Sequence, residues 1–234
     1  MCIRDSPFGF VNVVLGEGIY DLDNMADNMG KPFRTQDALM IKKYPCCGGN
    51  HAMLDSLFSL MRDNNFTYDD VADAEIDQSY FSVVMLYQEP DDELKGKFSA
   101  KYNVAAALID GEVGIDTFTG DKIAEHNDKG TMDKVRTRVM AKSEELLTES
   151  ADGLKVKITL KDGRVFEHTT ARSEILGSQQ NPWGFDAIKE KFQDNVSRVL
   201  SNDGTAKAIE TWQSIPDMTD IATAIRSTLV AENA

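Results

Sequence analysis

The sequence predicts an α+β domain with an antiparallel sheet over roughly residues 31–175, followed by helices over residues 176–234. Two observations favour this fold class. Residues 154–160 and 164–169 have strand character and flank Lys161-Asp162-Gly163, and an Asp-Gly pair between two such runs is a strong hairpin signal. After residue 184, apolar residues recur at the three- and four-residue spacing of amphipathic helices.

The first part of the predicted domain contains an apolar run, a turn and a helix. Residues 38–44 begin with apolar side chains and are stopped by Pro45, which predicts a short strand. Residues 46–50 predict a loop, with Asn50 as the N-cap of a helix from His51 to about Arg62. We expect one face of that helix to be buried, because four apolar residues fall at helical spacing: Leu54, Leu57, Phe58 and Met61.

The remainder of the domain alternates between strand and helix patterns. Residues 74–86 are rich in β-branched and aromatic side chains and predict a strand, and residues 135–139 alternate with strand period. Residues 98–109 predict a helix that ends at Asp110-Gly111. The apolar stripe expected on this helix consists of Phe98, Tyr102, Ala105, Ala106 and Ile109.

Helical segments are predicted at both ends of the chain. Residues 8–30 predict a helical tail and a short helix, and residues 178–184 (SQQNPWG) break the pattern before the C-terminal helices. Those helices carry three apolar stripes: Phe185, Ile188, Phe192, Val196 and Val199; Ala206, Ile209 and Trp212; Ile221, Ile225 and Leu229. Each stripe needs an apolar partner, and the short N-terminal tail supplies little surface for this.

This mismatch predicts three regions. Residues 1–30 are expected to be the end of a helical domain, residues 31–175 the α+β domain, and residues 176–234 helices that return to the helical domain. We therefore expect a mostly missing all-α domain and interpret the chain as the C-terminal portion of a larger protein. Residues 1–6 (MCIRDS) follow no pattern and resemble a translated sequencing adapter, so we expect them to be artefactual.

The composition excludes several classes of function. The 234 residues carry a net charge of −14, which opposes binding to nucleic acid or to an anionic membrane surface. No apolar run approaches the length needed to cross a bilayer, and no secretory signal is recognisable. Three cysteines do not make a disulfide framework, which favours the cytoplasm. A polyanionic substrate would need a site with local positive charge.

The segment from Ile41 to His51 is the strongest candidate for such a site. It contains Lys42, followed by Gly48 and Gly49, which let a ligand approach the backbone closely. The backbone N–H groups at the start of the next helix attract anions. At that position the helix dipole disfavours the charged form of His51, and a neutral imidazole suits a general base. The competing interpretation is an ordinary strand-to-helix turn with a capping Asn50 and an exposed histidine.

Metal and cofactor sites are not indicated. Cys46 and Cys47 are neighbours whose side chains point in divergent directions, whereas an iron–sulfur cluster needs several spaced thiolates. His126 and His168 have no partners at ligand spacing. No nucleophile elbow, phosphate-binding loop or dinucleotide fingerprint is present in the sequence. We therefore expect neither a metal nor a cofactor.

Three segments together resemble a known family. They are residues 43–51 (KYPCCGGNH) with 52–56, residues 97–111 (KFSAKYNVAAALIDG), and residues 177–183 (GSQQNPW) leading into 185–192. In this order they are similar to the MmgE/PrpD family, which includes 2-methylcitrate dehydratase and cis-aconitate decarboxylase. The resemblance implies a large helical domain and a smaller α+β lid over residues 31–175, with the active site in the cleft between them. It also implies homodimers that act on tricarboxylic acids without a metal.

The resemblance also implies roles for particular residues. Lys42 matches a substrate-binding lysine, and His51 matches a histidine slightly downstream. Cys47 stands where the decarboxylase-like members carry an active-site histidine, and this departure argues against decarboxylation because a thiol is a poorer proton shuttle than imidazole. Tyr87 is the nearest match to an expected tyrosine. The predicted site thus has His51 and Cys47 as catalytic residues, and a substrate-binding set of Lys42, Gly48, Gly49 and Tyr87.

The expected function is that of a metal-independent hydro-lyase of the 2-methylcitrate dehydratase type. Abstraction of a proton α to a carboxylate of a tricarboxylic or related hydroxy acid would precede loss of a β-hydroxyl group. An epimerase or isomerase, or a decarboxylase, is the alternative within the family. A non-catalytic module that serves only in association is the alternative from another class. The chain alone is expected to be inactive and poorly soluble.

Overall fold

The computed structural model describes residues 39–78, 87–139 and 153–229, together with a few isolated positions before residue 39. The chain divides into two units, Met1–Leu39 and Met40–Ala234. Most of the helical segment predicted at residues 8–30 lies outside the described residues, as do residues 79–86 of a predicted strand. The second unit contains the elements that follow.

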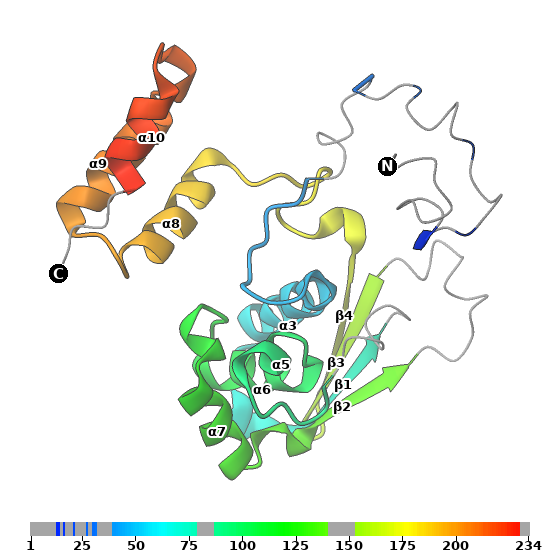
Figure 1. Cartoon of the computed structure of the whole chain (residues 1–234). Coiled ribbons are helices and arrows are strands. Elements are labelled where there is room, and N and C mark those ends of the chain that lie inside the picture. Colours follow the sequence, from blue (N-terminus) through cyan, green and yellow to red (C-terminus); the bar gives the residue numbers. More distant parts are fainter. Residues whose placement is uncertain are drawn as a thin grey trace. The chain divides into compact units, whose positions relative to one another are not determined.

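A four-stranded mixed sheet forms the centre of this unit (Figure 1). Its strands are β1 (Val71–Gln78), β2 (Val135–Val139), β3 (Gly153–Leu160) and β4 (Val165–Ala171), in the spatial order β2-β1-β3-β4. The predicted hairpin is confirmed, since β3 and β4 pair antiparallel around Lys161-Asp162-Gly163. Strand β1 also pairs antiparallel with β3, with an irregularity in register near Val71.

The prediction of an antiparallel sheet is confirmed for the β1–β3 and β3–β4 pairs, but β1 and β2 are parallel, so the sheet is mixed. The physical reason lies in the connection between them. Parallel neighbours need a crossover of a dozen or more residues, usually helical. Here the chain leaves β1 at Gln78 and passes through α5 (Glu93–Lys97), α6 (Ala100–Asp110) and α7 (Gly120–Asp128) before β2 begins. The hairpin signal described only the β3–β4 pair.

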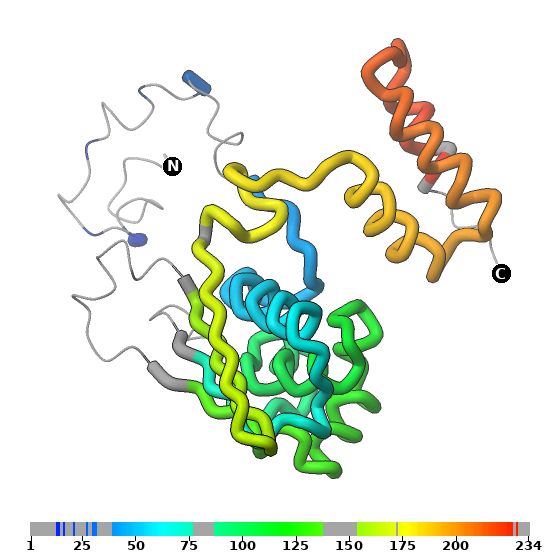
Figure 2. The backbone as a smooth tube through the Cα atoms, turned by 180° about the vertical axis from the view of Figure 1, so that it is seen from behind, coloured from blue at the N-terminus to red at the C-terminus, as the bar shows by residue number. Residues whose placement is uncertain are grey.

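Helices cover one face of the sheet, as Figures 1 and 2 show from opposite sides. Helix α3 (His51–Asn64) packs on β3 and β4, and α6 packs on β2. Side chains with little or no exposure fill the space between helices and sheet: Met53, Leu54, Leu57, Ile76, Tyr102, Val104, Val156 and Ile158. Burial of each large apolar side chain contributes roughly 1.5–3 kcal/mol, so this layer holds α3 firmly against the sheet.

Both predicted helices of the domain are confirmed, but α6 begins at Ala100 and not at Phe98, and its buried surface differs from the expected stripe. Leu54 and Leu57 of α3 are fully buried, and α6 ends at Gly111, which adopts the left-handed conformation at φ 73°. Ile109 of the expected α6 stripe is exposed, whereas Val104 and Ala107 outside that stripe are buried. Helix α6 contacts α3, α5 and α7 as well as β2, so burial extends around most of the helix rather than along one stripe.

The predicted strand at residues 38–44 is wrong for the part that the structure describes. Residues 39–47 form neither helix nor strand. Ile41 makes one backbone hydrogen bond, from its N–H to the carbonyl of Gly177 at 3.0 Å. The apolar side chains that suggested a strand are not buried as those of a core strand would be: Leu39 is 66% exposed and Met40 is 37% exposed.

Three helices follow the sheet, as predicted: α8 (Phe185–Val196), α9 (Asn202–Gln213) and α10 (Ile221–Leu229). Helix α9 contacts both α8 and α10. Helix α8 has no fully buried residue, and apolar side chains of the predicted stripes are exposed: Phe185, Val199, Trp212 and Ile221. Among the described residues, no helix has both the length and the apolar character needed to cross a bilayer.

Candidate functional site

The loop that precedes α3 places most of the predicted site residues together. A short 3-10 helix, η1 (Gly48–Asn50), leads directly into α3, and the His51 N–H donates to the Gly48 carbonyl. Helical structure therefore begins three residues earlier than predicted. The first N–H groups of a helix have no acceptor within it, and here these groups belong to Gly48 and Gly49, which are both partly exposed.

The predicted N-cap role of Asn50 is wrong. Asn50 has helical backbone angles (φ −87°, ψ −13°) and makes no capping hydrogen bond with its side chain. Its amide Nδ2 instead donates to the carbonyl oxygen of Lys97 at 3.2 Å. Asn50 is buried, and this bond to a distant backbone carbonyl gives its side-chain amide a hydrogen-bond partner in the core.

The Lys97–Phe98 segment also brings Tyr87 to the loop. The Cys47 N–H donates to the Lys97 carbonyl at 3.0 Å, and the Tyr87 N–H donates to the adjacent Phe98 carbonyl at 3.3 Å. Tyr87 is exposed, with 47% of its surface accessible. The structure therefore places the Tyr87 backbone close to Cys47, although 40 residues separate them in the sequence.

Lys42 lies at the surface of the same loop. Lys42 is exposed, and its Nζ donates to the Cys46 carbonyl at 3.1 Å. An ammonium group has three donors, so this bond leaves two for a carboxylate. The bond also directs the side chain back over the loop, toward the start of α3.

The two cysteines have different surroundings. Cys46 is only 4% exposed, and its burial raises the pKa of the thiol to about 12, so the side chain is neutral at physiological pH. Cys47 is partly exposed. Of the pair, Cys47 is thus the thiol that a ligand at the loop surface can reach.

His51 is enclosed in the core. Its side chain is fully buried and meets the Tyr44 ring edge-on at a centroid distance of 5.3 Å. Burial lowers the pKa of His51 to about 4, with Asp55 opposing and Lys42 assisting the shift. The imidazole is therefore neutral, as predicted, but the main cause is burial and not the helix dipole. Among the described residues, neither ring nitrogen makes a hydrogen bond. The Tyr44 backbone is nevertheless close enough to oppose the lowering of the His51 pKa.

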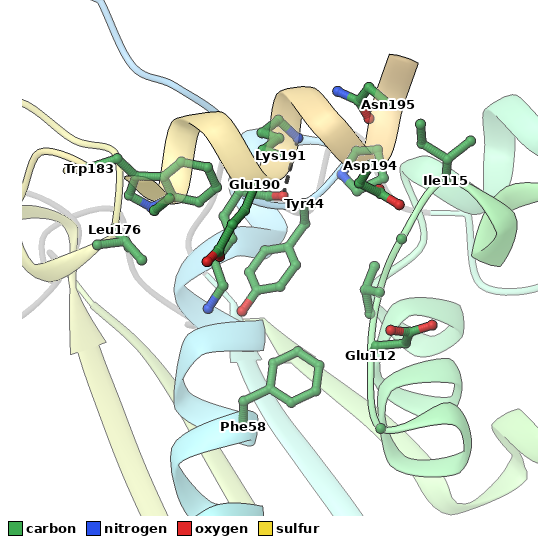
Figure 3. A pocket seen from close by; sticks show the side chains of 16 residues that line it. Tyr44, Phe58, Glu112, Ile115, Leu176, Trp183, Glu190, Lys191, Asp194 and Asn195 are labelled. Carbon is green, nitrogen blue, oxygen red and sulfur yellow. Dashed lines mark hydrogen bonds between the residues drawn. The ribbon is translucent and has the colours of Figure 1, made fainter. Parts of the chain in front are cut away.

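A cavity of about 570 Å³ is lined by residues 43–45 of the loop (Figure 3). Tyr44 and Phe58 line one side, and Glu112 and Ile115 face them from the other. Helix α8 borders the cavity, where Lys191 Nζ donates to the Lys43 carbonyl at 3.4 Å. Lys43 lines this cavity, whereas Lys42 does not. The cavity has two ammonium groups against the carboxylates of Glu112, Glu190 and Asp194, a balance that does not favour a polyanion.

Sequence reasoning missed Asp55 and Tyr44. The Tyr44 hydroxyl donates to Asp55 Oδ1 at 2.8 Å, and Lys43 Nζ lies 3.4 Å from the same oxygen. One signal was present in the sequence, since Asp55 follows His51 by four residues and so shares its helix face. Within the described residues, no group of three or more His, Cys, Asp or Glu side chains is arranged to hold a metal ion.

The fold and the loop define the class of protein: an α+β domain that presents a lysine, a thiol and a glycine-bearing helix start at one surface. A sequence profile of the MmgE/PrpD C-terminal domain matches residues 44–215. The chain belongs to the MmgE/PrpD family, as its sequence segments predicted.

Two relatives extend this assignment. The chain is 26% identical to the cis-aconitate decarboxylase of Mus musculus over 140 residues, which is 58% of this chain and 27% of the mouse protein. It is 26% identical to the cis-aconitate decarboxylase of Homo sapiens over 132 residues, which is 56% of this chain and 26% of the human protein. The matched region thus spans about a quarter of each relative.

Proposed function

We propose that this chain contributes to a lyase that removes a proton α to a carboxylate of a tricarboxylic or related hydroxy acid and then eliminates the β-hydroxyl group. The observation that carries the proposal is the position of Lys42, whose ammonium group is directed over the loop at the start of α3 in a member of the MmgE/PrpD family. Lys42 and the N–H groups of Gly48 and Gly49 would bind substrate carboxylates. The same groups would stabilise the negative charge that develops during proton abstraction.

Proton transfer is assigned to Cys47 and His51. Cys47 lies at the loop surface, next to the backbone that carries Tyr87. His51 lies deeper, behind Tyr44, and its neutral imidazole can accept a proton only when the loop gives access to it. In this proposal Cys47 is the nearer residue to the substrate, and residues 31–175 act as a lid over a helical domain supplied by a longer polypeptide. That enzyme would be a homodimer.

Decarboxylation is the second candidate, because both relatives are named cis-aconitate decarboxylase. A thiol at position 47 argues against it, since the resemblance places a histidine there in decarboxylase-like members. An epimerase would use the same proton abstraction without elimination.

Assays with a panel of hydroxy-tricarboxylates distinguish dehydration, decarboxylation and epimerisation. The assay uses the longest natural polypeptide that contains this sequence, because the chain matches only about a quarter of its relatives. A rise in ultraviolet absorbance from a new conjugated double bond supports the dehydratase. Release of carbon dioxide supports the decarboxylase, and exchange of the α-proton with deuterated solvent without net product supports the epimerase. A protein that produces none of these signals with any substrate contradicts the proposed chemistry.

A further inference from the structure

The Asp55 carboxylate is the point where the loop is attached to α3. Its side chain is 16% exposed and lies one turn after His51. Oδ1 accepts a hydrogen bond from the Tyr44 hydroxyl at 2.8 Å and lies 3.4 Å from Lys43 Nζ. A hydrogen bond from a neutral donor to a carboxylate is stronger than one between neutral groups, and partial burial limits competition from water.

The Tyr44 side chain is held on several sides at once. It is 3% exposed, stacks on Phe58 of α3 at 5.8 Å between ring centroids, and meets the His51 ring edge-on. Lys43 Nζ lies 4.9 Å from the centre of the same ring. Residues 43 and 44 are thus fixed to α3, and the residues of the proposed site, Lys42 on one side and Cys47 on the other, continue directly from them.

We propose that Asp55 is a positioning residue that fixes the loop from Lys42 to Cys47 mainly through Tyr44, with a minor contribution from Lys43. Its meaning for catalysis rests on the proposed function, but its effect on the loop does not. Without the carboxylate, the buried Tyr44 hydroxyl loses its acceptor and Lys43 loses its counter-charge. The loop then opens more often, and Lys42 and Cys47 no longer keep a fixed separation.

Labelling of Cys46 measures opening of the loop independently of activity. Cys46 follows Tyr44 by two residues, and its thiol is buried, so it is protected from alkylation while the loop is closed. The experiment follows iodoacetamide labelling of Cys46 by peptide mass spectrometry in a Cys47→Ser background. We expect Asp55→Ala to raise the labelling rate roughly 10- to 100-fold, as expected for loss of a hydrogen bond to a charged group. Asp55→Asn keeps an acceptor for Tyr44 and is expected to restore part of the protection. Asp63→Ala, on an exposed residue of the same helix, is the matched control and should leave the rate unchanged.

Tyr44→Phe removes only the hydroxyl group that donates to Asp55, so it tests the same attachment if Asp55→Ala fails to fold. We expect Tyr44→Phe to raise Cys46 labelling, and the double variant to add little to Asp55→Ala because both remove one interaction. Wild-type labelling rates in Tyr44→Phe, or fully additive effects in the double variant, overturn the proposal.

A second measurement separates this proposal from the proposed function. In a polypeptide that shows lyase activity, Asp55→Ala should lower kcat as well as raise KM, and Asp55→Asn should recover part of both. If the wild-type protein has no lyase activity while Asp55→Ala still exposes Cys46, the proposed function fails and the positioning role stands. If activity is present and Cys46 stays protected in Asp55→Ala and Tyr44→Phe, the positioning role fails alone.

Discussion

Lys42 and Lys43 are neighbours in the chain with different surroundings. Lys42 is exposed and contacts the Cys46 carbonyl, whereas Lys43 pairs with Asp55 and lines the cavity beside α8. If carboxylates bind at the start of α3, Lys42→Ala in an active polypeptide should lower kcat/KM roughly 30- to 1000-fold through loss of a charge-assisted contact. Steady-state kinetics over a range of substrate concentrations measure this effect.

Lys43→Ala is the control for that prediction. The variant loses the ion pair with Asp55. The Lys43 side chain in that pair is more than one-third exposed, and exposed ion pairs contribute little to stability. We therefore expect a much smaller change in kcat/KM. A sensitive Lys43 with a silent Lys42 would move the carboxylate site to the cavity side of the loop, and would reopen the roles given to Cys47 and His51.

His51 makes stability depend on pH. Burial holds its folded-state pKa at about 4, below the ordinary value of 6.5, so the unfolded chain binds a proton first as pH falls. Stability is therefore full above the ordinary pKa and is lost progressively between about pH 6.5 and pH 4. From pH 7 to pH 5 the expected loss from this residue is roughly 2 kcal/mol.

Urea denaturation of the wild type and of His51→Leu at pH 7 and pH 5 tests this expectation. The variant should lose less stability between the two pH values, whatever its absolute stability, because Leu does not titrate. His126, whose pKa burial also lowers, keeps part of the acid sensitivity in both proteins. Equal losses in wild type and variant would mean that His51 is not buried as the structure places it.

At the scale of elements, Gly177 joins the segment before the loop to the segment after β4. It has φ +90°, and its carbonyl accepts the backbone hydrogen bond from Ile41. A Cβ atom at this position would lie 2.1 Å from the Ile41 carbonyl oxygen. The backbone would have to move to relieve this clash. We expect Gly177→Ala to destabilise the domain by on the order of 3 kcal/mol or more, measured by urea denaturation.

Two other glycines provide matched controls. Gly163 in the β3–β4 turn has φ +88° but no atom within 4 Å of an added Cβ, so Gly163→Ala should cost only about 1–2 kcal/mol from backbone strain. Gly184, the N-cap of α8, has φ −66° and open space around it, so Gly184→Ala should cost only about 0.5 kcal/mol, the difference between glycine and alanine at an N-cap. An order of destabilisation other than Gly177, Gly163, Gly184 contradicts this interpretation.

The sequence predicted the elements whose signals are local. The Lys161-Asp162-Gly163 turn, the stop of α6 at Gly111 and the apolar face of α3 depend on residues close together in the chain. The parallel pairing of β1 with β2 was not predictable in this way, because it joins strands separated by three helices. Register and partner choice in a sheet depend on such non-local contacts.

The same distinction applies to the candidate site. The loop from Lys42 to His51 was found from its glycines and its lysine, which are local signals. Asn50 was assigned as a cap from its intrinsic preference, but the Lys97 carbonyl, 47 residues away, takes its amide instead. The attachment of Tyr44 to Asp55 and the burial of His51 depend on how the loop folds onto α3, so composition and spacing did not reveal them.

At the scale of the whole molecule, activity is expected to need more polypeptide than this chain provides. The match covers only about a quarter of the length of each relative, and the proposed function makes this chain the lid over a helical domain. We therefore expect the purified 234-residue chain to show no turnover in the same assays in which a longer polypeptide is active. Turnover by the chain alone would show that the loop and its surroundings form a complete active site.

The exposed apolar side chains of the C-terminal helices are expected to make the chain self-associate. Phe185 is 55% exposed and Val199 is 64% exposed, and helix α8 has no fully buried residue. A net charge of −14 opposes association by mutual repulsion. Added salt screens this repulsion and leaves the apolar attraction, so association should increase with ionic strength. Sedimentation velocity at low and high salt measures the effect.

A matched pair of substitutions locates the surface responsible. Val199→Glu adds a charge just after α8, and Val165→Glu adds the same charge on β4, where Val165 is 50% exposed. Because both variants change net charge equally, mutual repulsion alone would reduce association by the same amount in each. We expect Val199→Glu to reduce association strongly and Val165→Glu to reduce it only slightly, since the partly exposed apolar stripes lie on α8–α10. Equal effects of the two variants, or a wild-type chain that stays monomeric at high salt, would show that these stripes do not drive association.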